Sequence, residues 1–263
     1  MNVEELFQSF SGKKIHVLLN EGNRGDGLIH EGGRTLFRKY NINYEEFVFP
    51  AEKSGDILCV YGCGGFCSKH QHNIRKVNHY TAAFKTIYIL PSTFECSCKN
   101  VADFILRLPR KVVIYCREKE SFEEVKKVAP YKENVFLDKD MAFHLDYSKW
   151  KTDGRGVLMA FRYDEEKNMS FFVRGYIKCL KEWLLFAHNA VYMDVSAGPS
   201  NEWKFLLETV SQFNEVHTDR AHTSIAAAML GKKTHIYPGA YFKQKAIYEH
   251  SLSHMPNVKL MWP

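Results

Sequence analysis

The sequence predicts an α/β protein built from two Rossmann-like domains with parallel sheets. Short apolar segments alternate with helical ones along the chain, a pattern typical of βαβ units. A polar stretch near residues 146–156 interrupts this series, which then begins again. With 263 residues, the chain is long for one domain and short for three. We therefore expect one domain over residues 1–150 and a second over residues 151–263.

The expected strands are the short apolar runs, and the expected helices fill the segments between them. Strands are expected at 14–19, 56–61, 86–90, 111–116, 135–137, 156–161, 190–194, 216–218 and 234–237, the last of which closes its sheet. Helices are expected from the turn at 20–27 to about residue 40 and at 73–84, 99–108, 122–128, 171–188 and 201–213. Ser121 is the expected N-cap of the helix at 122–128. Because ligands of open α/β sheets bind at the carboxyl ends of strands, we expect a binding cleft between the two halves.

Composition limits the functional classes. Hydrophobic residues make up 45% of the chain and charged residues 25%, as in ordinary soluble proteins. The net charge of +6 is spread along the sequence without a block of like charges. This favours a small anionic substrate or a membrane surface over a nucleic acid, and a solvated basic surface accounts for it equally well. Without an apolar leader or a long apolar run, a cytoplasmic location is expected, with peripheral membrane contact as an option.

Seven cysteines raise the question of a metal site. Cys59, Cys63 and Cys67 follow one another at four-residue spacing, with His70 and His72 behind them. Structural zinc sites usually show CxxC pairs separated by a longer spacer, and that pairing is absent. We therefore expect buried thiols in a reducing compartment and no metal site.

Two glycine-rich turns follow the first two expected strands. The first turn contains Asn23 and Asp26; Asp26 can either accept a hydrogen bond from a substrate hydroxyl or cap the next helix. The second contains Gly64 and Gly65, whose amides can face an anion or simply form a tight turn. Its spacing does not match GxGxxG, so a dinucleotide site is not expected.

Arginines follow two other strands. Arg117 comes directly after the strand at 111–116, and Arg162 after the strand at 156–161. The guanidinium group presents a fixed fork of donors that matches phosphate and carboxylate. Both are therefore candidate substrate-binding residues, although either one alone could be a surface arginine.

The stretch from His217 to Gly231, HTDRAHTSIAAAMLG, combines a charged start with a small-residue helix. Asp219 or Thr218 is the expected N-cap of a helix that begins near Arg220. Free N–H groups at a helix start attract anions, and Arg220 adds a full charge. His222 adds a group able to donate a proton near neutral pH. The pattern predicts an anion pocket with an attached acid; a capped helix with a buried histidine is the alternative.

Six segments, taken in order, resemble motifs of the polysaccharide pyruvyl transferase family. They are GNRGDGLIHEGG at 22–33, YGCGGF at 61–66, IYCREKES at 114–121, DKDMAF at 138–143, TDRAH at 218–222, and a closing Lys243 with Tyr248 and Glu249. The late Asp-Arg-x-His motif, in which Ala221 replaces a leucine, is the most specific of them. The resemblance covers nearly the whole chain.

The resemblance implies a GT-B-like fold whose two sheets face a cleft. It also implies transfer of a pyruvyl group from phosphoenolpyruvate to a saccharide or lipid-linked saccharide, giving a cyclic ketal in exopolysaccharide or cell-surface glycan synthesis. No cofactor and generally no metal are implied. Arg220 and His222 fall on family residues that bind or act on phosphoenolpyruvate, and Arg162 matches a second donor-binding arginine, with Arg117 as the alternative.

These expectations assign roles to the candidates. His222 is the expected acid, Arg220 and Arg162 hold the anionic groups, and Asp26 or His30 is the expected base. Asn23, Gly64, Gly65 and Lys243 complete the expected substrate-binding set. The first domain is expected to take the acceptor and the second phosphoenolpyruvate. The alternatives are a GT-B-like glycosyltransferase that uses a nucleotide sugar and a non-catalytic anion-binding protein.

Overall fold

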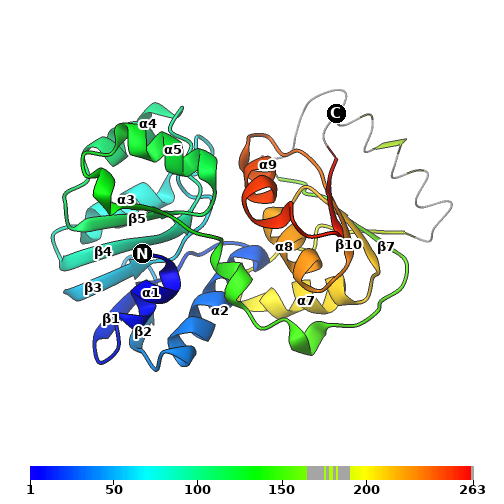
Figure 1. Ribbon diagram of the computed structural model, residues 1–263, viewed down its shortest axis with the longest axis horizontal. Helices are drawn as coiled ribbons and strands as arrows, with labels where there is room; N and C mark the ends of the chain where they lie inside the picture. The colour runs from blue at the N-terminus through cyan, green and yellow to red at the C-terminus, as the bar shows by residue number, and fades with distance from the viewer. Residues whose placement is uncertain (165–174, 176–177, 180–181, 183–189, 262–263) are drawn as a thin grey trace. The chain divides into compact units, whose positions relative to one another are not determined.

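The computed structural model describes residues 1–164, 175, 178–179, 182 and 190–261 (Figure 1). The chain divides into two compact units. The first unit comprises residues 1–21 and 29–145, and the second comprises residues 22–28 and 146–263. The segment 22–28 thus groups with the second unit although it lies in the expected first domain. Its Arg24 donates to Glu202 (Nε–Oε2, 3.1 Å) and its guanidinium covers the ring of Phe205.

The first unit contains a six-stranded parallel sheet with the order β2-β1-β3-β4-β5-β6. Its strands are β1 (Lys14–Leu18), β2 (Asn43–Phe47), β3 (Gly55–Val60), β4 (Phe84–Ser92), β5 (Val112–Cys116) and β6 (Val135–Leu137). From β1 the chain adds β2 on one side, and from β3 it continues to β6 on the other. The strand order therefore reverses between β1 and β3, which is the position where open α/β sheets bind ligands.

Helices cover both faces of this sheet. They are α1 (Val3–Gln8), α2 (Arg24–Lys39), α3 (His72–Tyr80), α4 (Lys99–Leu106) and α5 (Lys119–Val128). Successive side chains of a strand point to opposite faces, so Ile57 and Cys59 pack with α1 and α2, whereas Leu58 and Val60 pack with α3, α4 and α5.

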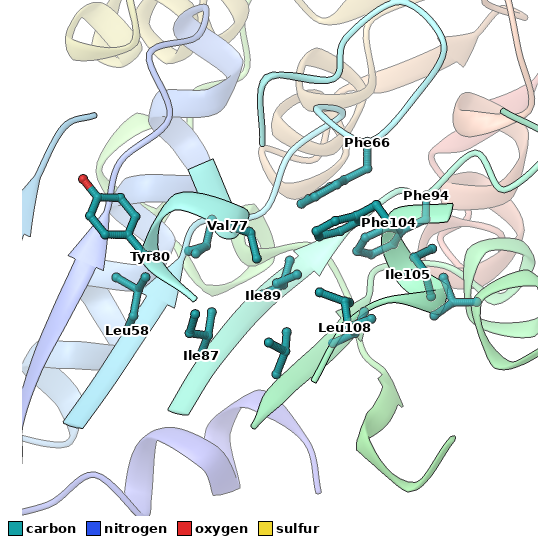
Figure 2. Packing of buried hydrophobic residues seen from close by; sticks show 14 of the residues in the cluster. Leu58, Phe66, Val77, Tyr80, Ile87, Ile89, Phe94, Phe104, Ile105 and Leu108 are labelled. Atoms are coloured by element: carbon teal, nitrogen blue, oxygen red, sulfur yellow. The ribbon is translucent and has the colours of Figure 1, made fainter. Parts of the chain in front are cut away.

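An aromatic stack extends the second of these cores. Figure 2 shows Phe66, Phe94 and Phe104 grouped together near Ile105 of α4 and Ile89 of β4, within the same apolar cluster. The ring centroids of Phe66 and Phe94 are 4.6 Å apart, and those of Phe66 and Phe104 are 5.7 Å apart. Each fully buried aromatic or aliphatic side chain stabilises the fold by about 1.5–3 kcal/mol.

The second unit contains a five-stranded parallel sheet with the order β11-β10-β9-β7-β8. Its strands are β7 (Val157–Ala160), β8 (Val191–Tyr192), β9 (Glu215–Thr218), β10 (Lys233–Ile236) and β11 (Val258–Leu260), and its helices include α7 (Trp203–Ser211), α8 (Ala221–Met229) and α9 (Lys243–Ile247). From β7 the chain adds β8 on one side and continues through β9 to β11 on the other. The strand order of this sheet therefore reverses between β7 and β9.

Short helical turns connect these elements. They are η1 (Lys132–Asn134), η2 (Met141–His144), η3 (Ser148–Trp150), η4 (Ser200–Glu202) and a π-helical turn, η5 (Tyr248–Leu252).

The predicted fold class is confirmed, since both units are α/β with parallel sheets. A cleft between the two sheets stays a prediction. Two edge strands went unpredicted: β2 carries two glutamates in five residues, and β11 has only three residues. The strand at 234–237 does not close its sheet, because β11 lies beyond β10. The helix expected at 171–188 falls largely outside the described residues.

The predicted helix caps were wrong. Glu118, not Ser121, caps α5: the helix begins three residues earlier than predicted, and the Glu118 carboxylate accepts from the Ser121 amide (2.8 Å). Arg220 occupies the N-cap position of α8, and no side chain there accepts from the helix. Thr218 accepts from the Arg220 amide (3.0 Å), and Asp219 is engaged elsewhere.

Candidate functional site

The candidate site lies at the reversal of strand order in the second sheet. Ala160 and Thr218 pair at the carboxyl ends of β7 and β9. Arg162 follows the first of these strands by two residues, and Arg220 follows the second by two. The two predicted donor-binding arginines therefore emerge from neighbouring strand ends, where an open sheet leaves room for a ligand.

Two aspartates hold Arg220. Its Nε donates to Oδ1 of Asp194 (3.1 Å), and its Nη2 donates to the other oxygen of that carboxylate. Its Nη1 lies 2.7 Å from Oδ2 of Asp164. The Asp194 side chain is 3% exposed, whereas that of Asp164 is 46% exposed. The buried carboxylate fixes the guanidinium plane through a two-point contact, and the exposed one covers its remaining edge.

Asp164 also contacts Arg162. Its Oδ1 lies 2.8 Å from Nε of Arg162, so one half-exposed carboxylate bridges both arginines. This arrangement shows that the space between the two guanidinium groups accommodates a carboxylate with short contacts to each. The sequence predicted a simple cationic pocket, and the structure instead matches its cations with aspartates.

Asp219 connects the backbone after β7 to α9 beside the candidate site. Its carboxylate accepts from the Arg162 amide (2.9 Å), and its own carbonyl accepts from Nε2 of Gln244 (2.9 Å). Burial raises the pKa of Asp219 to about 6, against the lowering effect of the Arg162 amide and of the two arginines. This aspartate therefore sets the backbone after β7 and places α9 against the site.

His222 lies against the start of α2. A methyl group on Gly25 would come within 2.6 Å of Nδ1 and 2.8 Å of Cβ of His222. Only glycine at this position lets the imidazole rest on the backbone. Segment 22–28 and His222 belong to the same unit, so the glycine-aspartate turn and the Asp-Arg-x-His motif meet although nearly 200 residues separate them.

Asn23 and Asp26 form a reciprocal helix cap. Oδ1 of Asn23 accepts from the Gly25 amide (2.8 Å), and Oδ2 of Asp26 accepts from the Asn23 amide (2.9 Å). These bonds satisfy the amide of Gly25, in the first helical turn, and the amide of Asn23 just before the helix. Of the two uses considered for Asp26, the structure therefore shows the cap. The cap holds the turn in the shape that receives His222.

Other predicted residues lie in the first unit. Arg117 is 1% exposed; its Nη1 lies 2.7 Å from Asp140, and its Nε donates to Thr93 (2.8 Å). The Gly65 amide donates to Sγ of Cys63 (2.9 Å), which supports the tight-turn alternative for Gly64 and Gly65. These three residues belong to the first unit, and Arg220 belongs to the second.

His30 and Lys243 are both buried. The imidazole of His30, in the first unit, lies against the ring of Tyr61, 4.8 Å between centroids. In the second unit the ammonium group of Lys243 lies 4.9 Å from the ring centroid of Tyr241. Its neighbour Gln244 contacts the site directly through Asp219.

Sequence reasoning missed Asp164, Asp194 and Gln244. The rule that polar residues gather at carboxyl strand ends could have found Asp194, which follows β8, the neighbour of β7. Asp164 lies two residues after Arg162, within the segment already singled out for its arginine. Gln244 carries no such signal, because α9 reaches the site only through tertiary packing.

No helix in the described part of the chain is long and apolar enough to cross a membrane. All seven cysteines lie within the described ranges, and none of them forms a disulfide there.

Comparison with known proteins identifies a family and a fold. The profile of a family described as polysaccharide pyruvyl transferase matches residues 23–238, well over half of the chain. The structure is similar to that of an uncharacterized protein from Klebsiella pneumoniae, with a TM-score of 0.80, 23% identity, and coverage of 99% of this chain and 97% of that one. At this identity the likeness shows the fold alone.

A weaker similarity concerns a Listeria monocytogenes protein described as a candidate UDP-N-acetylglucosamine 2-epimerase. The TM-score is 0.43 at 10% identity, with coverage of 85% of this chain and 78% of that one. A search of curated proteins gave no match.

Proposed function

The chain belongs to the polysaccharide pyruvyl transferase family, and from this premise we propose that it moves the pyruvyl group of phosphoenolpyruvate onto a saccharide as a cyclic ketal. Family membership makes the protein a transferase with a role in polysaccharide synthesis and a saccharide as its acceptor. The donor, the ketal and the residue roles given below form the proposal.

One observation carries the proposal: Arg162 and Arg220 share a carboxylate at the strand-order reversal. Phosphoenolpyruvate bears a carboxylate and a phosphate ester on the same carbon, so a site for it needs at least two converging cations. We propose that the ligand takes the place of the Asp164 carboxylate. Asp194 stays in contact with Arg220 and keeps the guanidinium group oriented.

The proposed reaction begins with a proton from the His222 imidazolium to the methylene carbon of phosphoenolpyruvate. The central carbon then becomes oxocarbenium-like, and a saccharide hydroxyl oxygen bonds to it and gives up its proton. The bond to the phosphate oxygen breaks, and a second hydroxyl adds and gives up its proton, closing the ketal. The two released protons balance the one on the new methyl group and the one on inorganic phosphate.

The arginines stabilise the departing phosphate, where negative charge develops. We propose Asp26 as the base in addition to its capping contact with the Asn23 amide, because it lies next to Gly25, which contacts His222. We further propose that Asn23 and Lys243 contribute to donor binding.

The proposal extends to the acceptor and its location. We place the saccharide or lipid-linked saccharide on the first unit and the donor on the second, with the protein at the cytoplasmic face of a membrane. The strand-order reversal between β1 and β3, next to Gly64 and Gly65, supports a second binding position there.

The direct test is turnover. Purified protein is incubated with phosphoenolpyruvate and a panel of saccharides, inorganic phosphate is measured, and the product is checked by NMR for the methyl group of a ketal. We expect phosphate release that depends on the saccharide and falls sharply in Arg220→Lys. Turnover of a nucleotide sugar without phosphoenolpyruvate consumption would replace the proposal with a glycosyltransferase. Binding of phosphoenolpyruvate without turnover on any saccharide would indicate an anion-binding protein.

A further inference from the structure

A second cluster of chemically active side chains lies on the strands that precede the candidate site. Glu215 and His217 are two residues apart on β9, so they share one face of the sheet. His235 on β10 pairs in register with His217. We call Glu215, His217 and His235 the β9–β10 cluster. Its three residues come from two adjacent strands of the sheet, not from loops.

The ligand-type atoms of this cluster converge. Nε2 of His217 and Nε2 of His235 each lie 3.0 Å from Oε1 of Glu215. The two imidazole rings are stacked, with centroids 4.4 Å apart and planes 14° apart. One ligand atom from each residue lies within 4.8 Å of the others. Ligands at about 2 Å from a tetrahedral metal ion are roughly 3.3 Å apart, so this spacing suits a shared ion.

The histidines are set up for such an ion. Nδ1 of His217 lies 2.8 Å from the hydroxyl of buried Tyr237. Because this hydroxyl can accept as well as donate, it can hold the tautomer whose Nε2 lone pair is free. Nδ1 of His235 makes no hydrogen bond to any described residue, and the short contact between its Nε2 and Glu215 lacks hydrogen-bond geometry. A metal ion would give Nε2 of His235 and the Glu215 carboxylate a common partner.

The charges around the cluster are consistent with this use. The side chains of His217 and His235 are only 6% and 13% exposed, and that of Glu215 is 22% exposed. The competing cation is Lys233, whose exposed ammonium group lies 3.1 Å from Oε2 of Glu215. Lys259 on β11 pairs in register with His235 and adds positive charge nearby.

We propose that Glu215, His217 and His235 bind a zinc-class divalent cation, with water in the remaining coordination position. Two imidazoles and a carboxylate form a donor set that zinc prefers over magnesium or calcium. Glu215 precedes Asp219 by four residues, about 13 Å along an extended strand. The ion therefore lies away from the arginines, joins β9 to β10, and takes no part in the proposed transfer.

The test is zinc binding by the untagged, chelator-treated full chain. We expect one Zn²⁺ per chain in competition with a chromophoric chelator, a raised Tm, and the visible spectrum of a tetrahedral site when Co²⁺ is added instead. His235→Gln and Glu215→Gln should weaken zinc binding at least tenfold. His254→Gln, which changes an exposed histidine of the same unit, should leave it unchanged.

Lys233→Ala removes the competing ammonium group and keeps all three ligands, so it should bind zinc at least as tightly as the unaltered protein. This variant keeps the test decisive if the ligand variants fold poorly. Absence of zinc uptake by both the unaltered protein and Lys233→Ala would overturn the proposal, as would equal uptake by a folded His235→Gln.

Discussion

Arg117 and Arg220 are two arginines with the same sequence signal and different surroundings. Each follows a buried parallel strand, β5 or β9, and each pairs with a buried aspartate. Arg117 and its partner Asp140 are both 1% exposed, whereas Arg220 also meets Asp164, which is 46% exposed. An arginine at a strand end is therefore no sign of a binding site by itself. What distinguishes the two is the exposed second carboxylate beside Arg220, which we propose that the ligand replaces.

The largest effect should come from breaking the fully buried ion pair of Arg117 and Asp140. Arg117→Met leaves the Asp140 carboxylate buried without its partner, which should lower the free energy of unfolding of the first unit by about 3–5 kcal/mol. Replacing both partners, as Arg117→Met with Asp140→Asn, should recover most of this loss. Denaturant titration measures both variants, and phosphate release per folded molecule should stay unchanged. A stable Arg117→Met variant with impaired turnover would move Arg117 into the site.

The next effect concerns Arg220. Arg220→Ala would leave Asp194 unpaired in a buried position and confuse activity with folding, so Arg220→Lys is the sharper change. Lysine keeps the charge but loses the two-point fork. We expect kcat/KM for phosphoenolpyruvate to fall by about 10²–10³-fold with little change in Tm. Arg155→Lys, an exposed change in the same unit, is the control. Turnover in Arg220→Lys equal to that of the control would remove Arg220 from the mechanism.

A smaller effect should follow from Gly25→Ala. The added methyl group would overlap Nδ1 and Cβ of His222, so the imidazole must shift, and we expect kcat to fall by about 10–100-fold. Gly231→Ala is the matched control. It strains a residue with φ of +77° after α8, with open space around the new methyl group. Equal losses of kcat in the two variants would show that helix stability, not the position of His222, matters.

The smallest effect should be a gain. Asp164→Asn removes the charge that competes with the ligand for both arginines. Because a half-exposed ion pair contributes about 1 kcal/mol at most, we expect phosphoenolpyruvate to bind about threefold to fivefold more tightly. Calorimetric titration measures the affinity. Weaker binding would mean that Asp164 contacts the ligand instead of making way for it.

The sequence predicts the central strands and the candidate residues, but it does not predict the edge strands or the partners of these residues. Apolar runs locate the central strands, and the charged start of α8 marks Arg220 and His222. The edge strand β2 is not predicted, because partly exposed polar residues stand where an apolar run would mark a strand. The observed caps of α5 and α8 differ from the predicted ones because residues distant in the sequence compete for the same side chains. Asp219, for example, accepts from the Arg162 amide instead of from an amide of α8.

Contacts between segments distant in the sequence were not predicted at all. Nothing in the residues around Gly25 indicates that this turn packs on His222, and the contacts of Arg24 with Glu202 and Phe205 are set only in the folded chain. The same holds for the surroundings of the two arginines. Whether a guanidinium group at a strand end is buried or accessible depends on carboxylates that the local sequence does not identify: Asp140 for Arg117, and Asp164 and Asp194 for Arg220.

A crystal structure of the protein soaked with phosphoenolpyruvate tests the central claim most directly. We predict that the ligand lies between the guanidinium groups of Arg162 and Arg220, with the Asp164 carboxylate displaced and the Asp194 contact kept. A ligand bound elsewhere, with Asp164 still bridging the two arginines, would contradict the account.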